Sequence, residues 1–337
     1  MNFTVLAVGP WYPATAFTFF AEAFARIGCR VIRVGPSYFT HMGLDWGRDD
    51  CPTVDLQFTR ERPEWNLPEV VDWCTRYASA PDLLFCSEEN YQTDIIPETR
   101  IPSVLWSADS WPENYAREAL WQPTLAYCNQ PRGNAIHPQA ETPKPWRFLP
   151  GAAAPWLHRN LHMERNVDFT LFATMYCKRP ELCAKLAERG CTVISGQRAL
   201  REYVIGYNVS LATYHNPGWW ECKWRWFEAA AMGCINISEY SPLLTQLGYL
   251  EHEHYLPVAT EFAPEFGDRW PTVESLAESI TWLRSNKNRA QEIADNAWRV
   301  TLLHHTYYNR IYRIFSDLGL DDLAERAEEA TKTCLLK

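Results

Sequence analysis

WWECKWRWFEAAAMGCINISEY, residues 219–240, is the stretch of sequence that decides the fold. Its first part spaces apolar residues three or four apart, as on one face of a helix: Trp220, Trp224, Phe227 and Ala231. Met232-Gly233 then provides the left-handed stop that ends many helices. An apolar strand follows directly at 234–238, so the helix must lie against a buried sheet. This succession predicts an α/β fold.

The same helix is expected to carry charged residues on a neighbouring face. Arg225 and Glu228 follow Glu221 by four and seven residues, a spacing that stacks side chains one above another on a helix. Lys223 adds a second cation. A carboxylate and cations that face a cleft suit the ribose and diphosphate of a nucleotide. The alternative interpretation is a structural ion pair of Arg225 with the two glutamates.

Apolar strands and helical patterns alternate on both sides of this stretch. Strands are expected at 3–9, 29–35, 54–58, 82–86, 103–107, 124–128, 167–174, 191–196 and 209–214. Helices are expected at 15–27, 66–78, 112–120, 180–188, 200–205, 273–285, 290–304 and 307–315. Apolar strands separated by helices indicate parallel sheets covered on both faces. Five prolines at 137–155 separate two such series, so we expect two tandem Rossmann-like domains.

Composition narrows the class of protein. The length of 337 residues suits two domains, and 47% hydrophobic with 22% charged residues is typical of globular chains. No apolar run is long enough to span a bilayer, and no basic segment precedes the first apolar stretch as in a signal peptide. The eleven cysteines match no zinc spacing, which favours free thiols in a reducing cytoplasm.

Charge is distributed unevenly along the chain. The net charge is −9, which disfavours a large nucleic-acid groove. Residues 1–150 carry 12 Lys and Arg against 18 Asp and Glu (net −6), and residues 226–337 carry 10 against 17 (net −7). Residues 151–225 carry 10 against 6 (net +4). This one basic zone leads into the helix and suits a small phosphorylated ligand.

Several common active-site motifs are missing from the sequence. There is no GxGxxG, no P-loop and no GxSxG elbow, which disfavours a dehydrogenase, a P-loop kinase and a serine hydrolase, and no pattern of metal ligands is present. Ligands of open α/β sheets bind at the carboxyl ends of strands. In the first domain these positions hold Glu88 and Asp109, which could orient an acceptor hydroxyl, and Trp11 and Trp111, which could stack on it. A helix N-terminal role for Asp109, and packing for any one of the sixteen tryptophans, are the alternatives.

The second domain offers a phosphate site after its first strand. Lys178 and Arg179 stand where a helix begins, with Pro180 near its first position. Cations at a helix N-terminus are unfavourable unless an anion lies there, whereas backbone N–H groups at such an end bind phosphate. His215, at the end of a later strand, is a further candidate.

These segments resemble a known group of enzymes. RWFEAAAMGC (225–234) resembles the donor domain of GT-B glycosyltransferases, and most closely the CgeB-like subgroup related to the retaining E-x7-E family. Four more segments are similar to that group in the same order: IPSVLWSADSW (101–111), WRFLPGAAAPWLH (146–158), DFTLFATMYCKRPELCAKL (168–186) and HHTYYNRIYRIF (304–315).

The resemblance implies a nucleotide-sugar donor, UDP above other nucleotides, as co-substrate and no cofactor. Glu228 would bind the ribose, and the diphosphate would be bound by Arg179, Lys223 and Arg225. Tyr176 would belong to the same donor site, and Gly196 would let the base approach the backbone.

Asp109, His215 and Glu221 are the candidate catalytic contacts. The sequence departs from the group at two of its positions. Glu221 precedes Glu228 by seven residues and not eight, and Ala154 stands where the linker of the group often has Asp.

The expected function is transfer of a hexose or pentose to an acceptor hydroxyl, with retention and without a metal. We expect an acceptor domain at 1–150, a donor domain at 151–304, and a helical tail at 305–337 that packs back on the first domain. The acceptor is a glycan, a small molecule or a modified DNA base. Two alternatives stand beside this function: a phage-type DNA glycosyltransferase acting on hydroxymethylated pyrimidines, and a non-catalytic nucleotide-sugar-binding or coat-associated protein.

Overall fold

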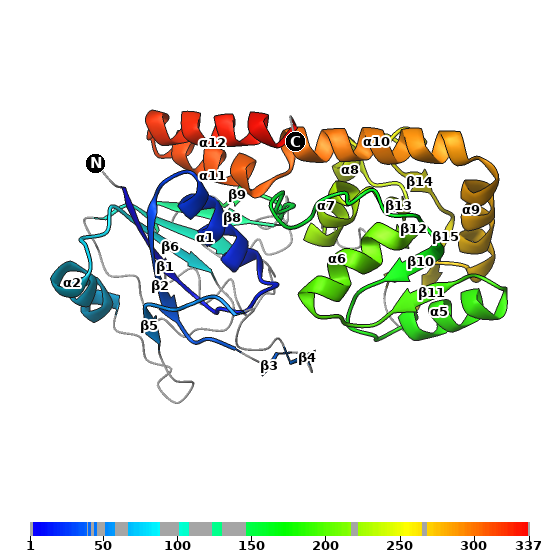
Figure 1. The fold of residues 1–337 in the computed structure, drawn as a ribbon, viewed down its shortest axis with the longest axis horizontal. Coiled ribbons are helices and arrows are strands. Elements are labelled where there is room, and N and C mark those ends of the chain that lie inside the picture. Colours follow the sequence, from blue (N-terminus) through cyan, green and yellow to red (C-terminus); the bar gives the residue numbers. More distant parts are fainter. Residues whose placement is uncertain are drawn as a thin grey trace. The chain divides into compact units, whose positions relative to one another are not determined.

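The chain forms two compact units in the computed structural model (Figure 1). Unit 1 combines Met1–Gly151 with Tyr307–Ala330, and unit 2 combines Ala152–Thr306 with Thr331–Lys337. The structure describes residues 3–38, 40–41, 44–45, 51–57, 67–87, 101–107, 123–129, 146–216, 222–264 and 268–335.

Unit 1 is built on a seven-stranded parallel sheet. Its strands are β1 (Thr4–Val8), β2 (Arg30–Gly35), β5 (Leu56–Gln57), β6 (Leu83–Ser87), β7 (Ser103–Ser107), β8 (Leu125–Cys128) and β9 (Arg147–Phe148). Their order is β5-β2-β1-β6-β7-β8-β9, so the direction of winding reverses beside β1. A separate antiparallel pair joins β3 (Thr40–His41) to β4 (Leu44–Asp45). This is the doubly wound arrangement expected of a Rossmann-like domain.

Helix α1 (Ala16–Arg26) covers one face of this sheet with aromatic rings. The Thr15 hydroxyl caps the helix by accepting a hydrogen bond from the Phe17 N–H at 3.2 Å. Phe17, Phe20 and Phe24 are fully buried, and their rings lie 5.5, 5.0 and 5.4 Å from that of Phe85 on β6. Helix α2 (Leu67–Tyr77) packs on the other face, where Val70 and Cys74 join a separate apolar cluster.

The C-terminal part of the chain completes the core of unit 1. Helix α11 (Tyr307–Asp317) packs on α1, with the Tyr307 ring 5.0 Å from Phe20 and the Phe315 ring 5.5 Å from Phe24. Helix α12 (Asp321–Leu335) follows it. The expected fold class, with C-terminal helices that cross back to the first domain, is confirmed.

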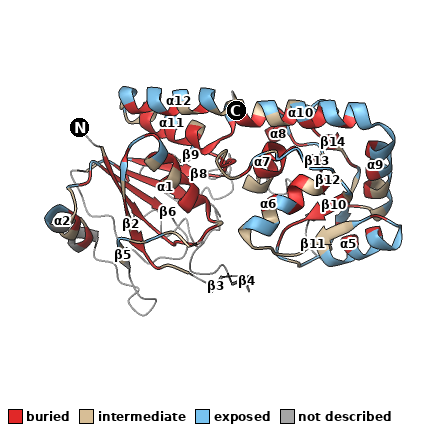
Figure 2. Cartoon of the chain, viewed as in Figure 1, coloured by how far each residue is buried: buried red, intermediate tan, exposed pale blue. Residues whose placement is uncertain are grey.

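Unit 2 repeats the architecture around a five-stranded parallel sheet (Figure 2). The strands are β10 (Val167–Leu171), β11 (Val193–Ser195), β12 (Ser210–Tyr214), β13 (Ile235–Ser238) and β14 (Leu256–Pro257), in the order β11-β10-β12-β13-β14. The helices are α5 (Arg179–Glu188), α6 (Leu200–Val209), α7 (Trp224–Ala231), α8 (Pro242–Gln246), α9 (Val273–Ser285) and α10 (Lys287–His304). An antiparallel hairpin joins β15 (Thr260–Ala263) to β16 (Asp268–Pro271).

The sheet of unit 2 separates two apolar clusters. On one side Phe169 packs with Leu182 of α5 and Leu276 of α9. On the other side Val204 of α6 packs with Ala229 of α7. Helices α6 and α7 therefore share one face of the sheet, and both contribute residues to the site described below.

A half-buried arginine, Arg165, fixes α6 and α7 relative to each other. Arg165 donates hydrogen bonds to the carbonyl oxygens of Tyr207 (3.1 Å), Ser210 (2.5 Å) and Met232 (2.9 Å), which belong to the C-terminal ends of both helices. Gly233 follows α7 with φ +70°, and a Cβ at this position would lie 2.6 Å from Arg165 Nη2. The predicted glycine stop is thus required by the backbone and by the arginine.

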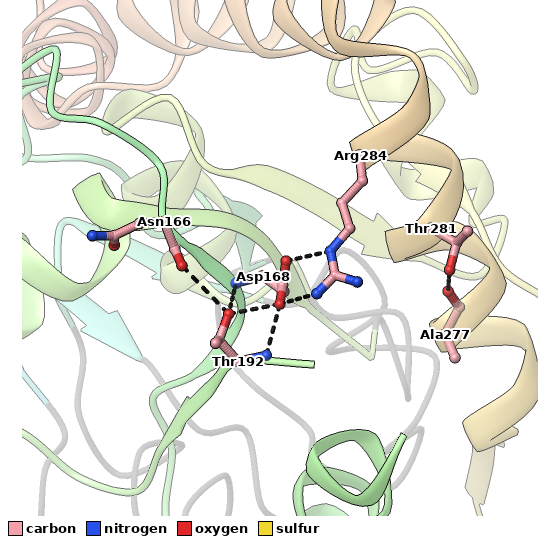
Figure 3. A network of polar contacts seen from close by, with 6 residues as sticks. All are labelled: Asn166, Asp168, Thr192, Ala277, Thr281 and Arg284. Carbon is pink, nitrogen blue, oxygen red and sulfur yellow. Dashed lines mark hydrogen bonds and ion pairs between the residues drawn. The ribbon is translucent and has the colours of Figure 1, made fainter. Parts of the chain in front are cut away.

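A polar network closes the amino end of the sheet (Figure 3). The Asp168 carboxylate accepts hydrogen bonds from the Thr192 N–H and hydroxyl, both at 2.6 Å, and from Arg284 Nε at 2.6 Å. Burial opposes ionisation of Asp168, but these hydrogen bonds hold the pKa of its carboxyl below the usual value. The network joins β10 to the loop before β11 and to the last turn of α9.

The structure corrects the expected course of the helix in 219–240. The helix begins at Trp224, because Lys223 has extended backbone angles (φ −60°, ψ 141°) and serves as its N-cap. Of the expected helical row, Arg225 and Glu228 lie on α7, and Glu221 lies outside the described residues.

Other differences are smaller. Helix α6 extends to Val209, beyond the expected end at 205, and the expectations did not include β9, α8, β14 or the β15–β16 hairpin. The expected helix at 112–120 lies outside the described residues.

Candidate active site

A pocket opens at the carboxyl end of the unit 2 sheet, where α/β proteins bind their ligands. Its wall is formed by the chain after β10, the end of β12, the first residue of α5 and the start of α7. The residues that line it are Leu171, Phe172, Ala173, Arg179, Tyr207, Tyr214, His215, Asn216, Lys223, Arg225 and Trp270. Four of the residues expected in the donor and catalytic sets thus come together here.

Three cations line this pocket: Arg179, Lys223 and Arg225. Arg179 donates to the Thr174 carbonyl oxygen at 2.8 Å, and its guanidinium lies 4.2 Å from the centre of the Tyr176 ring. Burial and the nearby charge of Arg225 lower the pKa of Arg179. Across the part of the chain that the structure describes, neither arginine forms an ion pair with a carboxylate. The pocket therefore carries positive charge that an anion would neutralise.

The two helices that begin at the pocket add backbone donors. Lys178 and Lys223 are the N-cap residues of α5 and α7, and neither side chain caps its helix. An ammonium group has no acceptor for the N–H groups of the first turn. Helix N-termini of this kind bind phosphate oxygens.

His215 contributes a neutral imidazole. Burial and the charges of Arg225, Arg179 and Lys223 hold the pKa of His215 well below its usual value. The residue is only 6% exposed, and its Nε2 has no hydrogen-bond partner among the described residues. A neutral ring that lines a cationic pocket can give or take one hydrogen bond without adding charge.

Glu228 lies beside the pocket and is buried. Its Oε2 accepts a hydrogen bond from the Tyr203 hydroxyl, and its Oε1 lies 3.7 Å from His158 Nε2. Burial raises the pKa of the Glu228 carboxyl to about 7, although the Tyr203 hydrogen bond and the charge of Arg225 oppose this rise. Of the structural ion pairs of Arg225 considered from the sequence, the one with Glu228 is not formed, because this carboxylate faces Tyr203 and His158, and the one with Glu221 lies outside the described residues.

Tyr176 and Gly196 lie near the ends of β10 and β11. Tyr176 is 52% exposed and stacks against Arg179. Gly196 follows β11 with φ +97°, which side chains rarely adopt, and its N–H donates to the Leu171 carbonyl oxygen at 3.2 Å. Neither residue lines the pocket in this structure.

Trp11, expected to contact the acceptor, is in the interior of unit 1. The residue is fully buried, its ring lies 4.9 Å from that of Phe17, and the Arg33 guanidinium lies 5.8 Å from its centre. Packing of the loop after β1 against α1 accounts for this position, and the ring has no surface on which an acceptor could stack. The remaining expected residues, Asp109, Glu221, Glu88 and Trp111, lie outside the described residues.

Sequence reasoning missed the aromatic wall of the pocket. Tyr207 lies one turn after Tyr203 on α6, so an i, i+4 pair was present as a signal. Trp270 comes from the β15–β16 hairpin, and no local pattern places it near β10.

Two further properties concern metals and membranes. No group of three or more His, Cys, Asp or Glu within the described ranges could hold a metal ion. Over the same residues, no helix combines the length and the apolar character needed to cross a membrane.

Comparison with known proteins agrees with this geometry. Residues 156–316, slightly less than half of the chain, match the family described as glycosyl transferase-like. A sequence search of curated proteins found no match.

Solved structures show the same fold. HepE from Anabaena in complex with UDP-glucose has a TM-score of 0.62 and 12% identity, over 94% of this chain and all of that one. Sucrose-phosphate synthase from Thermosynechococcus elongatus has a TM-score of 0.60 and 12% identity, over 95% of this chain and all of that one. A glycosyltransferase from Rickettsia africae has a TM-score of 0.58 and 10% identity, over 96% and 98% of the two chains. The chain therefore has the GT-B fold of these structures, and residues 156–316 are similar to the glycosyl transferase-like family.

Proposed function

We propose that the pocket of unit 2 binds a UDP-sugar and that the enzyme transfers its sugar to an acceptor hydroxyl. The observation that carries this proposal is the convergence of Arg179, Lys223 and Arg225 on one pocket at the carboxyl end of the sheet. Neither arginine is neutralised by a carboxylate of the described residues, so a diphosphate would supply the missing charge. HepE, solved with UDP-glucose, supports uridine as the nucleoside.

The cations would act on the leaving group. When the bond between the sugar C1 and the diphosphate oxygen breaks, negative charge develops on the phosphate. Fixed donors aimed at that charge lower the barrier because they need no reorganisation. His215 would add a hydrogen bond from a neutral ring. Because the side chains themselves supply the positive charge, we propose transfer without a divalent metal.

The remaining assignments follow from the resemblance to the E-x7-E family. Glu228 would bind the ribose hydroxyls, Tyr176 and Gly196 would adjoin the donor, and the configuration at C1 would be retained. Membership of the CgeB-like subgroup is part of the same proposal. Asp109, Glu221, Glu88 and Trp111 stay candidates for contacts with the acceptor or the reacting atoms.

Binding of UDP tests the donor site. Arg225→Ala removes one charged donor, which should raise the dissociation constant for UDP by about 10- to 100-fold. Arg201→Ala is the matched control, since Arg201 is an exposed arginine on α6 of the same unit and does not line the pocket. Isothermal titration calorimetry with UDP would measure both variants. Equal affinity of Arg225→Ala and Arg201→Ala would refute a diphosphate site at these residues.

Turnover tests the chemistry. UDP release from a panel of UDP-sugars should persist in the presence of EDTA. NMR of the newly formed product should show the anomeric configuration of the donor. Loss of activity with EDTA, or an inverted product, would overturn the corresponding part of the proposal.

A further inference from the structure

The carboxylate of Glu228 is faced on two sides by uncharged side chains, of which one donates a hydrogen bond to it. The Tyr203 hydroxyl donates to Oε2, and His158 Nε2 lies 3.7 Å from Oε1. The side chains of His158 and Glu228 are only 1% and 5% exposed. Water therefore has little access to this carboxylate, and its environment is set by protein groups.

The tautomer of His158 follows from its other nitrogen. Nδ1 accepts a hydrogen bond from the Ala154 N–H at 3.0 Å, so it carries no proton. Burial lowers the pKa of His158 to about 3, which keeps the ring neutral at physiological pH. The single ring proton is then on Nε2, on the side of the ring that faces Glu228.

The three residues come from elements that are themselves fixed. Tyr203 is on α6 and Glu228 is on α7, and Arg165 ties the C-terminal ends of these two helices together. His158 follows the turn that starts at Ala154, where its own N–H donates to the Ala154 carbonyl oxygen at 2.7 Å. The two donors are thus held in place independently of any ligand.

This group of residues adjoins the pocket through Tyr207. The Tyr203 ring lies edge-on to that of Tyr207 at 4.8 Å, and Tyr207 lines the pocket. An ionised carboxylate has about four lone-pair sites. Tyr203 occupies one of them on Oε2, and His158 Nε2 lies 3.7 Å from Oε1, which leaves other sites for hydroxyl groups of a ligand.

We propose that Tyr203 and His158 are positioning residues that orient the Glu228 carboxylate toward the ribose hydroxyls of the donor. The inference rests on the proposed function, in which Glu228 contacts the ribose. A glutamate side chain held in one orientation loses less conformational freedom when the ligand binds, so its contribution to affinity is larger.

Ribose preference is the property to measure. It is the ratio of the dissociation constants for 2′,3′-dideoxy-UDP and UDP, obtained by calorimetry on the full chain. Tyr203→Phe keeps the ring that packs on Phe172 and Tyr207 and removes only the hydroxyl. We expect the ratio to fall by about 5- to 10-fold, with the affinity for the dideoxy compound unchanged. Tyr255→Phe, at another buried tyrosine of unit 2 outside the pocket, should leave the ratio unchanged.

A pair of substitutions at His158 provides a second test if Tyr203→Phe does not fold. Gln places an N–H donor near the position of Nε2, whereas Asn places its polar atoms near Nδ1. His158→Gln should therefore keep more of the ribose preference than His158→Asn, by about 2- to 5-fold.

The outcomes separate the two proposals. A preserved ratio in Tyr203→Phe, or equal loss of affinity for both nucleotides, would overturn the positioning role while leaving the UDP site intact. Equal ratios in His158→Gln and His158→Asn would overturn the role of His158. If the wild-type protein binds no UDP or shows no ribose preference, the proposed donor contacts fail, and this inference fails with them.

Discussion

Burial of Glu228 should make the stability of unit 2 depend on pH in a defined direction. The pKa of its carboxyl rises from 4.5 to about 7 on folding. Between these values the folded protein binds more protons at this site than the unfolded chain, so the free energy of unfolding falls as pH rises. A difference of this size corresponds to about 3 kcal/mol. The stabilisation is fully present below pH 4.5 and is lost as pH rises through about 7.

Glu228→Gln isolates this contribution because the amide stays neutral and its oxygen can still accept from Tyr203. Without nucleotide, the variant should match the wild type at pH 4 and exceed it by about 3 kcal/mol at pH 8. For a unit of this size, that is about 6–12 °C in Tm. Differential scanning fluorimetry between pH 4 and 8 would measure it.

Glu202→Gln, at an exposed glutamate on α6, is the control, and its curve should run parallel to that of the wild type. Protonation of His158 and of other groups changes the stability of all three proteins in the same way. The differences in stability between them therefore report on the substituted carboxyl alone. A constant difference between Glu228→Gln and wild type would show that Glu228 ionises normally, and the buried site would be refuted.

Three further outcomes are expected. Asp168→Asn should lower the free energy of unfolding by about 1–3 kcal/mol, because it weakens the hydrogen bonds to Arg284 and Thr192. In urea titrations the wild type should be more stable by this full amount above pH 3.8, and the difference should shrink as pH falls below that value. A difference that does not depend on pH would contradict the described network. Gly233→Ala should lower the free energy of unfolding by about 1–3 kcal/mol in the same measurement, because the residue has a positive φ and its new Cβ would meet Arg165. Unchanged stability would argue against this close contact with Arg165. Cys177 is the exposed one of the eleven cysteines, so a thiol reagent should modify it first in the native protein, and Cys177→Ser should abolish the fast phase.

The elements with strong periodicity could be predicted from the sequence. Helix α1 has phenylalanines three and four residues apart that all bury against one sheet, and α9 has the expected bounds. The strands β9 and β14 have two residues each and are too short to show any pattern. The start of α7 was misplaced because neither Cys222 nor Lys223 is a capping residue, and the backbone angles of Lys223 decide the boundary.

The candidate site could be predicted only where its residues follow local rules. Arg179, Lys223 and Arg225 stand at helix starts after parallel strands, and that position alone directs them to one edge of the sheet. The neighbours of Glu228 follow no such rule. Tyr203 and His158 reach it from 25 and 70 residues away along the chain, and only the packing of α6 and the turn at Ala154 brings them there.

The position of α11 has a consequence for biosynthesis. Most of unit 1 is synthesised before unit 2, yet its core also needs Tyr307 and Phe315, which are made after nearly all of unit 2. Until then the outer side of α1 around Phe20 and Phe24 lacks its cover. The N-terminal unit is therefore the last to be completed, although domains generally fold in the order of their synthesis. A chain that stops after α10 would contain most of unit 2 and an N-terminal half with exposed aromatic rings, which is a substrate for chaperones and proteases.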